Sequence, residues 1–204
     1  LGPGRYAIKA ITEAGAERVI RFAFELARKR AGKHKVTLTS KYNMLHQSDG
    51  LFRDIGRSVA EEYSDIEFET FIVDDFLCRM ITQPDALDVV VTPNLYGDIL
   101  SDGAAGLIGG LGLAPSGCFG ADYAYFESAH GTAPDIQGMN VINPTATLLS
   151  AGMMLEYLGL EDAARALKNA VSATFKEGQN LTPDQGGTAT TTDCCNSVRL
   201  HLGI

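Results

Sequence analysis

The sequence predicts an α/β fold, and three observations indicate it. In the first half of the chain, short β-rich segments alternate with amphipathic helical segments. Polar residues follow these β-rich segments, as at the carboxyl ends of parallel strands. The second half consists mainly of helical segments separated by polar, glycine-containing loops. Alternation of this kind is typical of a mainly parallel sheet covered by helices.

Local patterns define the first strand–helix units. Residues 12–31 have apolar side chains at helical spacing, with Thr12 as the start signal and Gly32 at the end. Residues 36–39 alternate and are rich in β-branched types, which predicts a strand. Residues 49–63 carry the apolar stripe of a second helix.

Further units complete the first half. Residues 66–73 alternate as a half-buried strand, and Asp74 opens the helix that follows it. The apolar run Val89–Val91 predicts a buried strand. Residues 94–97 have turn chemistry, and another helix is expected after them. Its continuation at 104–113 is too apolar and too glycine-rich for an ordinary surface helix, so we expect this helix to be buried.

The second half has a different texture, and a domain boundary is predicted between residues 112 and 113. A turn is expected at 114–117, a short strand at 124–127 and a polar loop at 129–138. Apolar periodicity then predicts helices at 144–158, 162–176 and 194–202, with an open loop at 182–188.

Composition excludes several classes of partner. The net charge is −8 and no run is rich in lysine or arginine, which argues against nucleic acid and anionic membranes. No apolar run reaches membrane-spanning length. The four cysteines form no C-x-x-C pair, which indicates structural thiols in a reducing compartment. The opening residues look like a loop from the middle of a protein, so we expect the chain to be a fragment.

Asp98 and Asp102 are the first candidates for chemistry. They are four residues apart, so a helix places both carboxylates on one face. Like charges at this spacing repel, and a divalent cation would remove that penalty while gaining two hard oxygen ligands. The alternative is an ordinary solvated acidic face, but the apolar flanks of the pair favour a functional role.

Lys41 and Asn43 lie just past the carboxyl end of a predicted strand, where α/β folds place ligands. A lone lysine there is more often a surface charge, and an aspartate that opens a helix, such as Asp74, is by default a cap. Yet Asp74, Asp98 and Asp102 follow two adjacent units of the fold. The three carboxylates could therefore converge on one ion.

The polar loop at 129–138 has the composition of a nucleotide-binding loop. Residues 131–133 are small, so their backbone N–H groups can approach a phosphate closely. Asp135 is of the right type to accept hydrogen bonds from ribose hydroxyls and to repel a 2′-phosphate. His130 taken alone is more often structural than catalytic. The glycine-rich run at 106–112 lacks the G-x-G-x-x-G spacing, and we interpret it as close helix packing.

Five blocks together resemble one family, the β-decarboxylating dehydrogenases of isocitrate, 3-isopropylmalate and homoisocitrate. The blocks are residues 41–43, 94–102, 109–113, 130–136 and 143–144. The resemblance implies an isocitrate/isopropylmalate dehydrogenase-like fold that is incomplete at its N-terminus. It also implies that residues 1–112 form a small dimerisation domain with the metal and catalytic residues. Residues 113–204 would be the C-terminal part of a large cofactor-binding domain.

The resemblance implies roles for individual residues. Asp98 and Asp102 match ligands of Mg²⁺ or Mn²⁺. Asp74 matches a third metal-site aspartate, which each subunit of a homodimer gives to the site of its partner and which takes part in proton transfer. Lys41 matches the catalytic lysine, given to the partner's site in the same way, and Asn43 matches a substrate contact beside it.

An NAD site is implied as well. Asp135 and Ile136 are like the NAD-using branch of the family, whereas the NADP-using branch tends to place a basic residue and a tyrosine there. The implied cofactor-binding residues are Glu127, His130, Gly131, Thr132, Ala133, Pro134, Asp135, Ile136 and Asn143.

The activity that the resemblance implies is metal-dependent oxidative decarboxylation of a 2-hydroxy acid with NAD⁺ as hydride acceptor. Residues 48–52 look like isocitrate or homoisocitrate enzymes, and Thr132 favours isocitrate, which would give 2-oxoglutarate in the tricarboxylic acid cycle. Tyr42 and Gln185 depart from the family pattern, so homoisocitrate and 3-isopropylmalate stay open as substrates. Such an enzyme is expected in the cytoplasm, or in the mitochondrial matrix of a eukaryote.

The resemblance places further machinery before Leu1, namely the arginines that grip the substrate and a tyrosine that works with Lys41. The chain alone is therefore expected to be inactive. Two other classes of protein stay open. A non-catalytic regulatory subunit on the same fold typically loses the metal carboxylates, which are present here. A nucleotide-binding module without redox chemistry would bind NAD without metal-dependent turnover.

Overall fold

The computed structural model describes residues 2–30 and 32–204. Ala31, predicted as the last residue of the first helix, and Leu1 lie outside the described residues. The chain forms two compact units that divide between Ala104 and Ala105, inside the helix α4 (Asn94–Leu107). The division of roles between residues 1–112 and 113–204 stays a prediction. No helix among the described residues is long and apolar enough to span a membrane.

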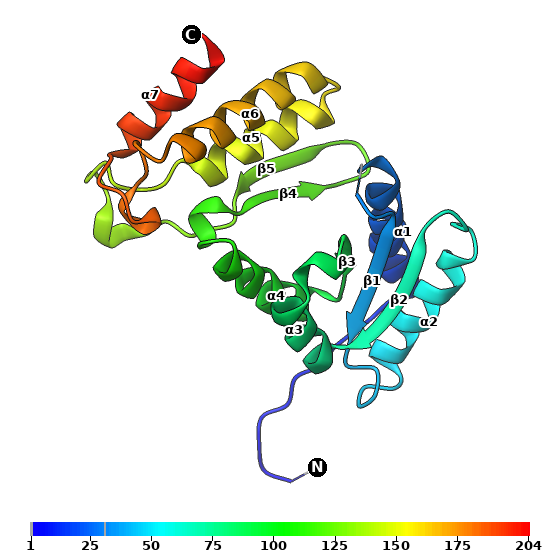
Figure 1. The fold of residues 1–204 in the computed structure, drawn as a ribbon. Helices are drawn as coiled ribbons and strands as arrows, with labels where there is room; N and C mark the ends of the chain where they lie inside the picture. Colours follow the sequence, from blue (N-terminus) through cyan, green and yellow to red (C-terminus); the bar gives the residue numbers. More distant parts are fainter. Residues whose placement is uncertain (1, 31) are drawn as a thin grey trace. The chain divides into compact units, whose positions relative to one another are not determined.

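The first unit is built on a parallel sheet, as the sequence predicts. Its strands are β1 (Lys35–Ser40), β2 (Glu67–Ile72) and β3 (Val89–Val91), in the order β2-β1-β3. β1 lies in the centre and pairs in parallel with both neighbours, as Figure 1 shows for β1 and β2. All three carboxyl ends therefore meet at one edge of the sheet, and the residues that follow them become neighbours.

Helices α1 (Glu13–Lys29) and α2 (Ser48–Ala60) cover one face of this sheet. The Thr12 hydroxyl caps α1 by accepting from the Gly15 N–H group. Apolar residues of both helices form one core with the sheet and with the connection between α2 and β2, namely Ala16, Ile20, Ala23, Phe24, Ala27, Val36, Leu38, Phe52, Val59, Tyr63, Ile66, Val89 and Val91. Gly56 allows the close approach of α2, because a Cβ atom there would lie 2.4 Å from the Cδ1 atom of Leu38.

Helix α3 (Val73–Thr82) packs against α4 through Phe76, Met80 and Leu100. Two expectations about α4 are wrong. Residues 94–97 were expected to form a turn, but they are the first turn of the helix, which begins directly after Pro93. The helix was also expected to be buried, yet Ile99 is 58% exposed. The glycine and alanine residues of α4 give it small side chains, but much of its surface stays exposed in one chain.

The second unit starts with an antiparallel hairpin of β4 (Pro115–Phe119) and β5 (Ala124–Ser128). The turn expected at 114–117 is therefore wrong, since most of these residues belong to β4. Proline is tolerated at the first residue of a strand, and Gly117 is needed there because a Cβ atom would lie 2.9 Å from the Phe126 ring. Turn-forming residue types here serve an edge strand and a close cross-strand contact.

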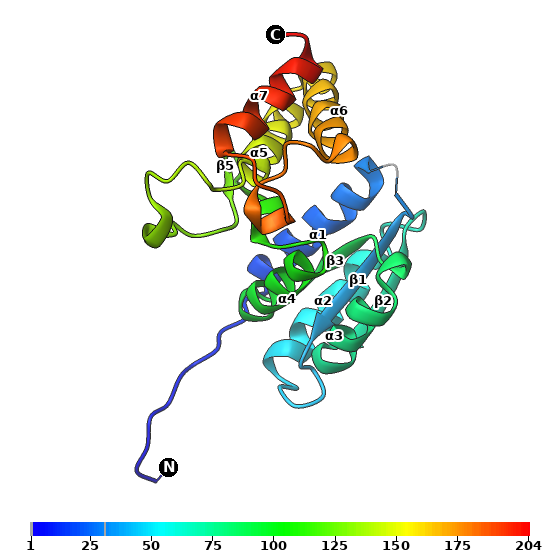
Figure 2. The same cartoon turned by 60° about the vertical axis from the view of Figure 1, so that its left-hand side comes forward.

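Helices α5 (Thr145–Tyr157), α6 (Glu161–Glu177) and α7 (Thr191–Leu202) complete the second unit. α5 contacts the hairpin and α6, and α6 contacts α7 (Figures 1 and 2). α7 begins three residues before the predicted start at 194. The cause is a capping box, in which the Thr190 hydroxyl accepts from the Asp193 N–H group and the Asp193 carboxylate accepts from the Thr190 N–H group.

Candidate functional site

Lys41 and Asp74 meet at the carboxyl edge of the parallel sheet. Ser40 and Ile72 are paired at the ends of β1 and β2, so the residues that follow them emerge side by side. The Nζ atom of Lys41 forms an ion pair with the Asp74 carboxylate. The hydrogen bond from Lys41 lowers the pKa of Asp74 below its ordinary value, and so does a hydrogen bond to the backbone. Asp74 is therefore ionised at neutral pH.

Asn43 lies in the turn directly after β1. The Lys41 carbonyl closes this turn by accepting from the N–H groups of Met44, at 3.0 Å, and Leu45, at 2.9 Å. Asn43 is exposed and lies two residues after Lys41 in the sequence, so its amide is open to solvent. An exposed amide at this edge can contact a polar ligand.

Asp98 and Asp102 lie one turn apart on α4, and both are exposed. Across residues 2–30 and 32–204, no group of three or more histidine, cysteine or acidic side chains is placed to hold a metal ion. The convergence of Asp74 with this pair is thus not formed within one chain. The expectation that Asp74 reaches the metal site of a second subunit stays a prediction.

Asp49 is a buried residue that sequence reasoning did not assign. Its side chain is fully buried at the start of α2. Its Oδ2 atom accepts from the backbone N–H group of Lys41 at 2.8 Å, and its Oδ1 atom pairs with the Lys9 ammonium. A lone aspartate in the segment 48–52 carries no spacing signal, so only the structure could connect it to Lys41.

The second unit holds a cavity of about 420 Å³, a volume within the range of small-molecule sites. Five of the predicted cofactor residues line it: His130, Gly131, Ala133, Ile136 and Asn143. Gly112, Val141, Ile142 and Asp184 complete the lining. The other predicted cofactor residues, Glu127, Thr132, Pro134 and Asp135, are exposed and are not part of this lining.

The loop from His130 to Ile136 is shaped by its small residues. Ala133 adopts a left-handed conformation, with φ at 43°, and a short 3₁₀ turn (Pro134–Ile136) follows it. A Cβ atom at Gly131 would meet no atom within 4 Å, so the backbone there is open to a ligand. The His130 Nδ1–H group donates to the Gly131 carbonyl at 2.9 Å, which holds the ring against its own loop.

Asp184 organises the floor of this cavity, and sequence reasoning missed it. Its carboxylate accepts from the Asn143 Nδ2 atom at 3.0 Å and from the Gln185 Nε2 atom at 3.0 Å, as well as from the Thr182 hydroxyl at 2.5 Å. Burial alone would raise the pKa of Asp184, but these hydrogen bonds outweigh it and hold the pKa below its ordinary value. The only sequence signal was the open loop at 182–188.

Asn143 has a structural task in addition to lining the cavity. It is 4% exposed, and its Oδ1 atom accepts from the Thr145 N–H group at 3.0 Å. That bond satisfies one of the free donors at the start of α5. One side of the Asn143 amide is therefore fixed by the helix and the other by Asp184.

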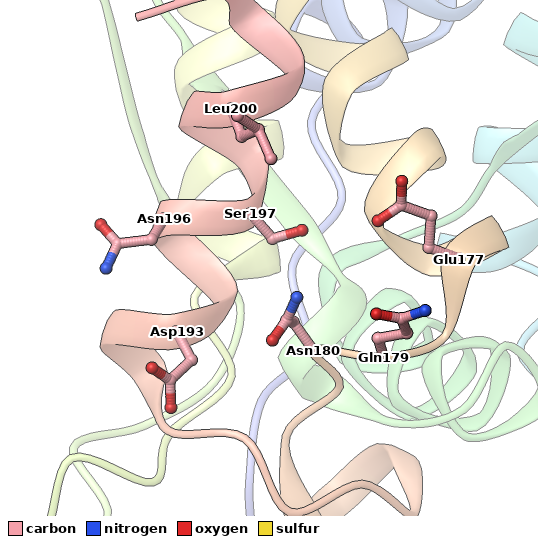
Figure 3. Close-up of a pocket in the computed structure, with 7 residues that line it drawn as sticks. All are labelled: Glu177, Gln179, Asn180, Asp193, Asn196, Ser197 and Leu200. Carbon is pink, nitrogen blue, oxygen red and sulfur yellow. The ribbon is translucent and has the colours of Figure 1, made fainter.

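A second cavity, of about 570 Å³, lies between the end of α6 and α7. Figure 3 shows its lining residues, Glu177, Gln179, Asn180, Asp193, Asn196, Ser197 and Leu200. It contains none of the predicted site residues. Asp193 is already used in the capping box of α7, so this cavity has fewer free polar groups than its lining suggests.

Comparison with known proteins decides the family. The sequence profile of the isocitrate/isopropylmalate dehydrogenases matches residues 3–198. The chain belongs to the isocitrate/isopropylmalate dehydrogenase family. A 3-isopropylmalate/3-methylmalate dehydrogenase of Methanocaldococcus jannaschii is 50% identical over 195 residues, which are 94% of this chain and 58% of that protein. The mitochondrial NAD isocitrate dehydrogenase subunit alpha of Macaca fascicularis is 52% identical over 192 residues, 94% of this chain and 55% of that protein.

Two solved structures have the same fold as this chain. The chain matches the crystal structure of isocitrate dehydrogenase from Methylococcus capsulatus with a TM-score of 0.90 and 46% identity, over 96% of this chain and 58% of that one. It also matches the TT0538 protein of Thermus thermophilus with a TM-score of 0.91 and 44% identity, over 97% of this chain and 40% of that one. The isocitrate/isopropylmalate dehydrogenase-like α/β fold is thereby confirmed. The chain spans little more than half the length of its curated relatives.

Proposed function

We propose that this family member takes part in the metal-dependent oxidative decarboxylation of a 2-hydroxy acid, with NAD⁺ as hydride acceptor. The observation that carries the proposal is the pairing of Lys41 with Asp74 at the carboxyl edge of the parallel sheet. Lysine and aspartate are the acid and base types that this reaction needs, and this edge is where such folds bind ligands.

The metal ligands in this proposal are Asp98 and Asp102 of one subunit, with Asp74 of the partner subunit as the third metal-site aspartate. Asp98 and Asp102 are both hard carboxylate ligands on one helix face, and in the described part of the chain neither forms an ion pair that would have to be broken. These properties fit Mg²⁺ or Mn²⁺. When bound, such an ion supplies a Lewis acid that polarises the hydroxyl and the adjacent carboxylate of the substrate.

Proton transfer falls to Lys41 and Asp74. The Asp74 carboxylate, kept ionised by the lysine beside it, accepts the proton of the substrate hydroxyl. After the β-carboxylate has left as CO₂, the Lys41 ammonium donates a proton to the carbon that carried it. Asn43, exposed in the next turn, donates its amide N–H group to a substrate oxygen.

The cofactor site in this proposal is the cavity beneath the 130–136 loop. The open backbone at Gly131 and the left-handed Ala133 suit close contact with the adenosine half of NAD. Asp135 is exposed on the same loop, where its carboxylate accepts from ribose hydroxyls and disfavours a 2′-phosphate. NAD supplies the hydride-accepting ring, and NADP is the disfavoured form.

We further propose a homodimer in which Lys41 and Asp74 complete the site of the partner subunit. The exposed apolar residues of α4 support this arrangement, because Leu95, Ile99 and Leu107 are each at least half exposed. Exposed apolar side chains, where they form one contiguous surface, are a feature of protein–protein contact sites. The protein would work in the cytoplasm, or in the mitochondrial matrix of a eukaryote.

The substrate proposed first is isocitrate, on the strength of the segment 48–52 and Thr132. A 3-isopropylmalate-type substrate is the second candidate, supported by the 50% identity to the archaeal 3-isopropylmalate/3-methylmalate dehydrogenase. Homoisocitrate is a third. A regulatory subunit is the alternative of another class, and the presence of Lys41, Asp74, Asp98 and Asp102 argues against it.

Turnover by the protein encoded in the complete reading frame around this sequence tests the proposal. NADH formation is followed with isocitrate, 3-isopropylmalate or homoisocitrate, with Mn²⁺ and then with excess chelator. The proposal predicts turnover of one of these acids with NAD⁺, lost on chelation and restored by Mn²⁺. Turnover that survives chelation, or none with any of the acids, would overturn it.

A further inference from the structure

Asp49 is fully buried, and a carboxylate is almost never fully buried in a protein unless it is paired. A buried charge is tolerated when it is paired and hydrogen-bonded. Both oxygens of Asp49 have partners. Oδ1 pairs with the Lys9 ammonium, and Oδ2 accepts from the Lys41 N–H group at 2.8 Å.

These contacts join the end of β1 to the start of α2. In addition to the Oδ2 contact with the N–H group of Lys41, the Ser40 hydroxyl donates to the backbone carbonyl of Asp49 at 3.3 Å. The N–H group of Asp49 donates to the Leu45 carbonyl at 2.9 Å, which closes the connecting turn. The backbone of Lys41 is therefore held at the exact point where the strand ends.

The backbone and the side chain of Lys41 bind different carboxylates. The backbone N–H group of Lys41 is bound by Asp49, while its side-chain ammonium pairs with Asp74. The buried carboxylate thus fixes the main chain without competing for the ammonium. Lys9, which neutralises Asp49, also lies 4.3 Å from the centre of the Tyr96 ring on α4.

We propose that Asp49, with Lys9 as its charge partner, is a positioning residue for Lys41. The proposal rests on the proposed function, in which Lys41 delivers a proton to the substrate. Misplacing a reacting group by about 1 Å can cost on the order of 100-fold in rate, so a rigid anchor for the Lys41 main chain has a direct catalytic value.

Three variants of the protein from the complete reading frame test this role. In Asp49→Ala the anchor is gone, and kcat per folded site is expected to fall on the order of 100-fold while KM stays within about twofold. Lys9→Met leaves a buried unpaired carboxylate and is expected to lower kcat as well. The double variant Lys9→Met/Asp49→Asn should regain most of kcat, because an asparagine oxygen still accepts from the Lys41 N–H group and no buried charge is left.

A matched control separates positioning from a general effect of charge loss on α2. Asp54→Asn removes another carboxylate of the same helix, one that is exposed and paired with Arg53 at 2.7 Å. This variant is expected to keep kcat and KM. A loss of the same size in Asp54→Asn would show that any charge change on α2 impairs the protein, and would overturn the specific role of Asp49.

A second readout does not depend on turnover. The rate at which an amine-reactive acetylating reagent labels Lys41 is measured by mass spectrometry in wild type and Asp49→Ala. We expect several-fold faster labelling in the variant, because a loosened main chain frees the ammonium from Asp74. If Lys41 labelling is unchanged, the positioning role is refuted, whether or not the protein shows dehydrogenase activity. If wild type lacks turnover but labelling changes as expected, the proposed function fails while the anchoring of Lys41 stands.

Discussion

Replacing Asp98 with asparagine separates the metal-site role of α4 from a structural one. Asp98 and Asp102 are exposed and one turn apart, so their charges repel by about 0.2–0.5 kcal/mol. Asp98 lies beyond the first turn of α4, where the helix dipole no longer stabilises a negative charge. Asp98→Asn is therefore expected to raise the free energy of unfolding slightly in the absence of metal.

With metal bound, wild type is expected to be more stable than Asp98→Asn. An ion that binds the folded state at 100 times its Kd stabilises it by about 2.7 kcal/mol, several times the repulsion that it relieves. Wild type is expected to show this gain with Mn²⁺ and Asp98→Asn to lose most of it. The same carboxylate should thus be mildly destabilising without metal and strongly stabilising with it.

Urea unfolding of the protein from the complete reading frame, with Mn²⁺ or with chelator, measures both effects, and calorimetry measures Mn²⁺ binding directly. Asp75→Asn is the matched control, since Asp75 is an exposed aspartate on α3 paired with Arg79 at 2.7 Å. It should lose a surface ion pair and keep the full response to Mn²⁺. Equal Mn²⁺ binding by wild type and Asp98→Asn, or a loss of stability in Asp98→Asn without metal, would refute the reasoning.

Three further predictions concern single sites. The pKa of Asp184 is lower in the folded chain than in the unfolded chain, for which 3.8 is the reference. The ionised Asp184 carboxylate therefore contributes its full stabilisation of the fold above that pH and loses it as the pH falls below it. The difference in Tm between wild type and Asp184→Asn should be constant above about pH 5 and shrink below about pH 4. Gly56→Ala should lower the free energy of unfolding by about 1–2 kcal/mol, because overpacking against the buried Leu38 outweighs the gain in helix propensity. Urea titration measures this change, and unchanged stability would contradict the close contact between Gly56 and Leu38. Burial raises the pKa of Cys194, whereas Cys78 is exposed, so iodoacetamide should alkylate Cys78 before Cys194. Peptide mass mapping follows the two reactions, and faster labelling of Cys194 would show that Cys194 on α7 is not buried.

The sequence predicted the periodic elements well because their burial pattern is local. The helix at 12–31 and the strands at 36–39 and 66–73 were found to within about two residues, a typical margin for element ends. Errors arose where residue type and context disagree. Residues 94–97 look like a turn but form the first turn of α4. Residues 115–117 look like a turn but belong to β4, because pairing with β5 overrides local propensity.

The candidate site was predictable only in part. Lys41 and Asp74 could each be singled out, Lys41 because it follows a predicted strand and Asp74 because it opens a helix after the next strand, but their ion pair was not predicted. Asp49 and Asp184 could not be singled out, because each is a lone aspartate whose role depends on partners elsewhere in the chain. Asp49 pairs with Lys9, 40 positions away, and no short motif marks that distance.

The exposed face of α4 shows a further limit of the sequence. Its apolar residues suggested burial, and in a single chain Leu95, Ile99 and Leu107 are exposed while Leu100 is buried. The amphipathic pattern of a helix does not tell whether its apolar face packs inside one chain or against another one. A second subunit would reconcile the pattern with the structure.

In the proposed homodimer, two chains build each site, with Lys41 from one and Asp98 from the other. Hybrid dimers test it most directly. The protein from the complete reading frame is prepared as Lys41→Met and as Asp98→Asn, each expected to be inactive, and the two are unfolded and refolded together. Random pairing then gives heterodimers with one intact site each, so the mixture should recover about one quarter of wild-type activity. If the mixture stays as inactive as its two components, the two chains do not share a site and the proposed homodimer is refuted.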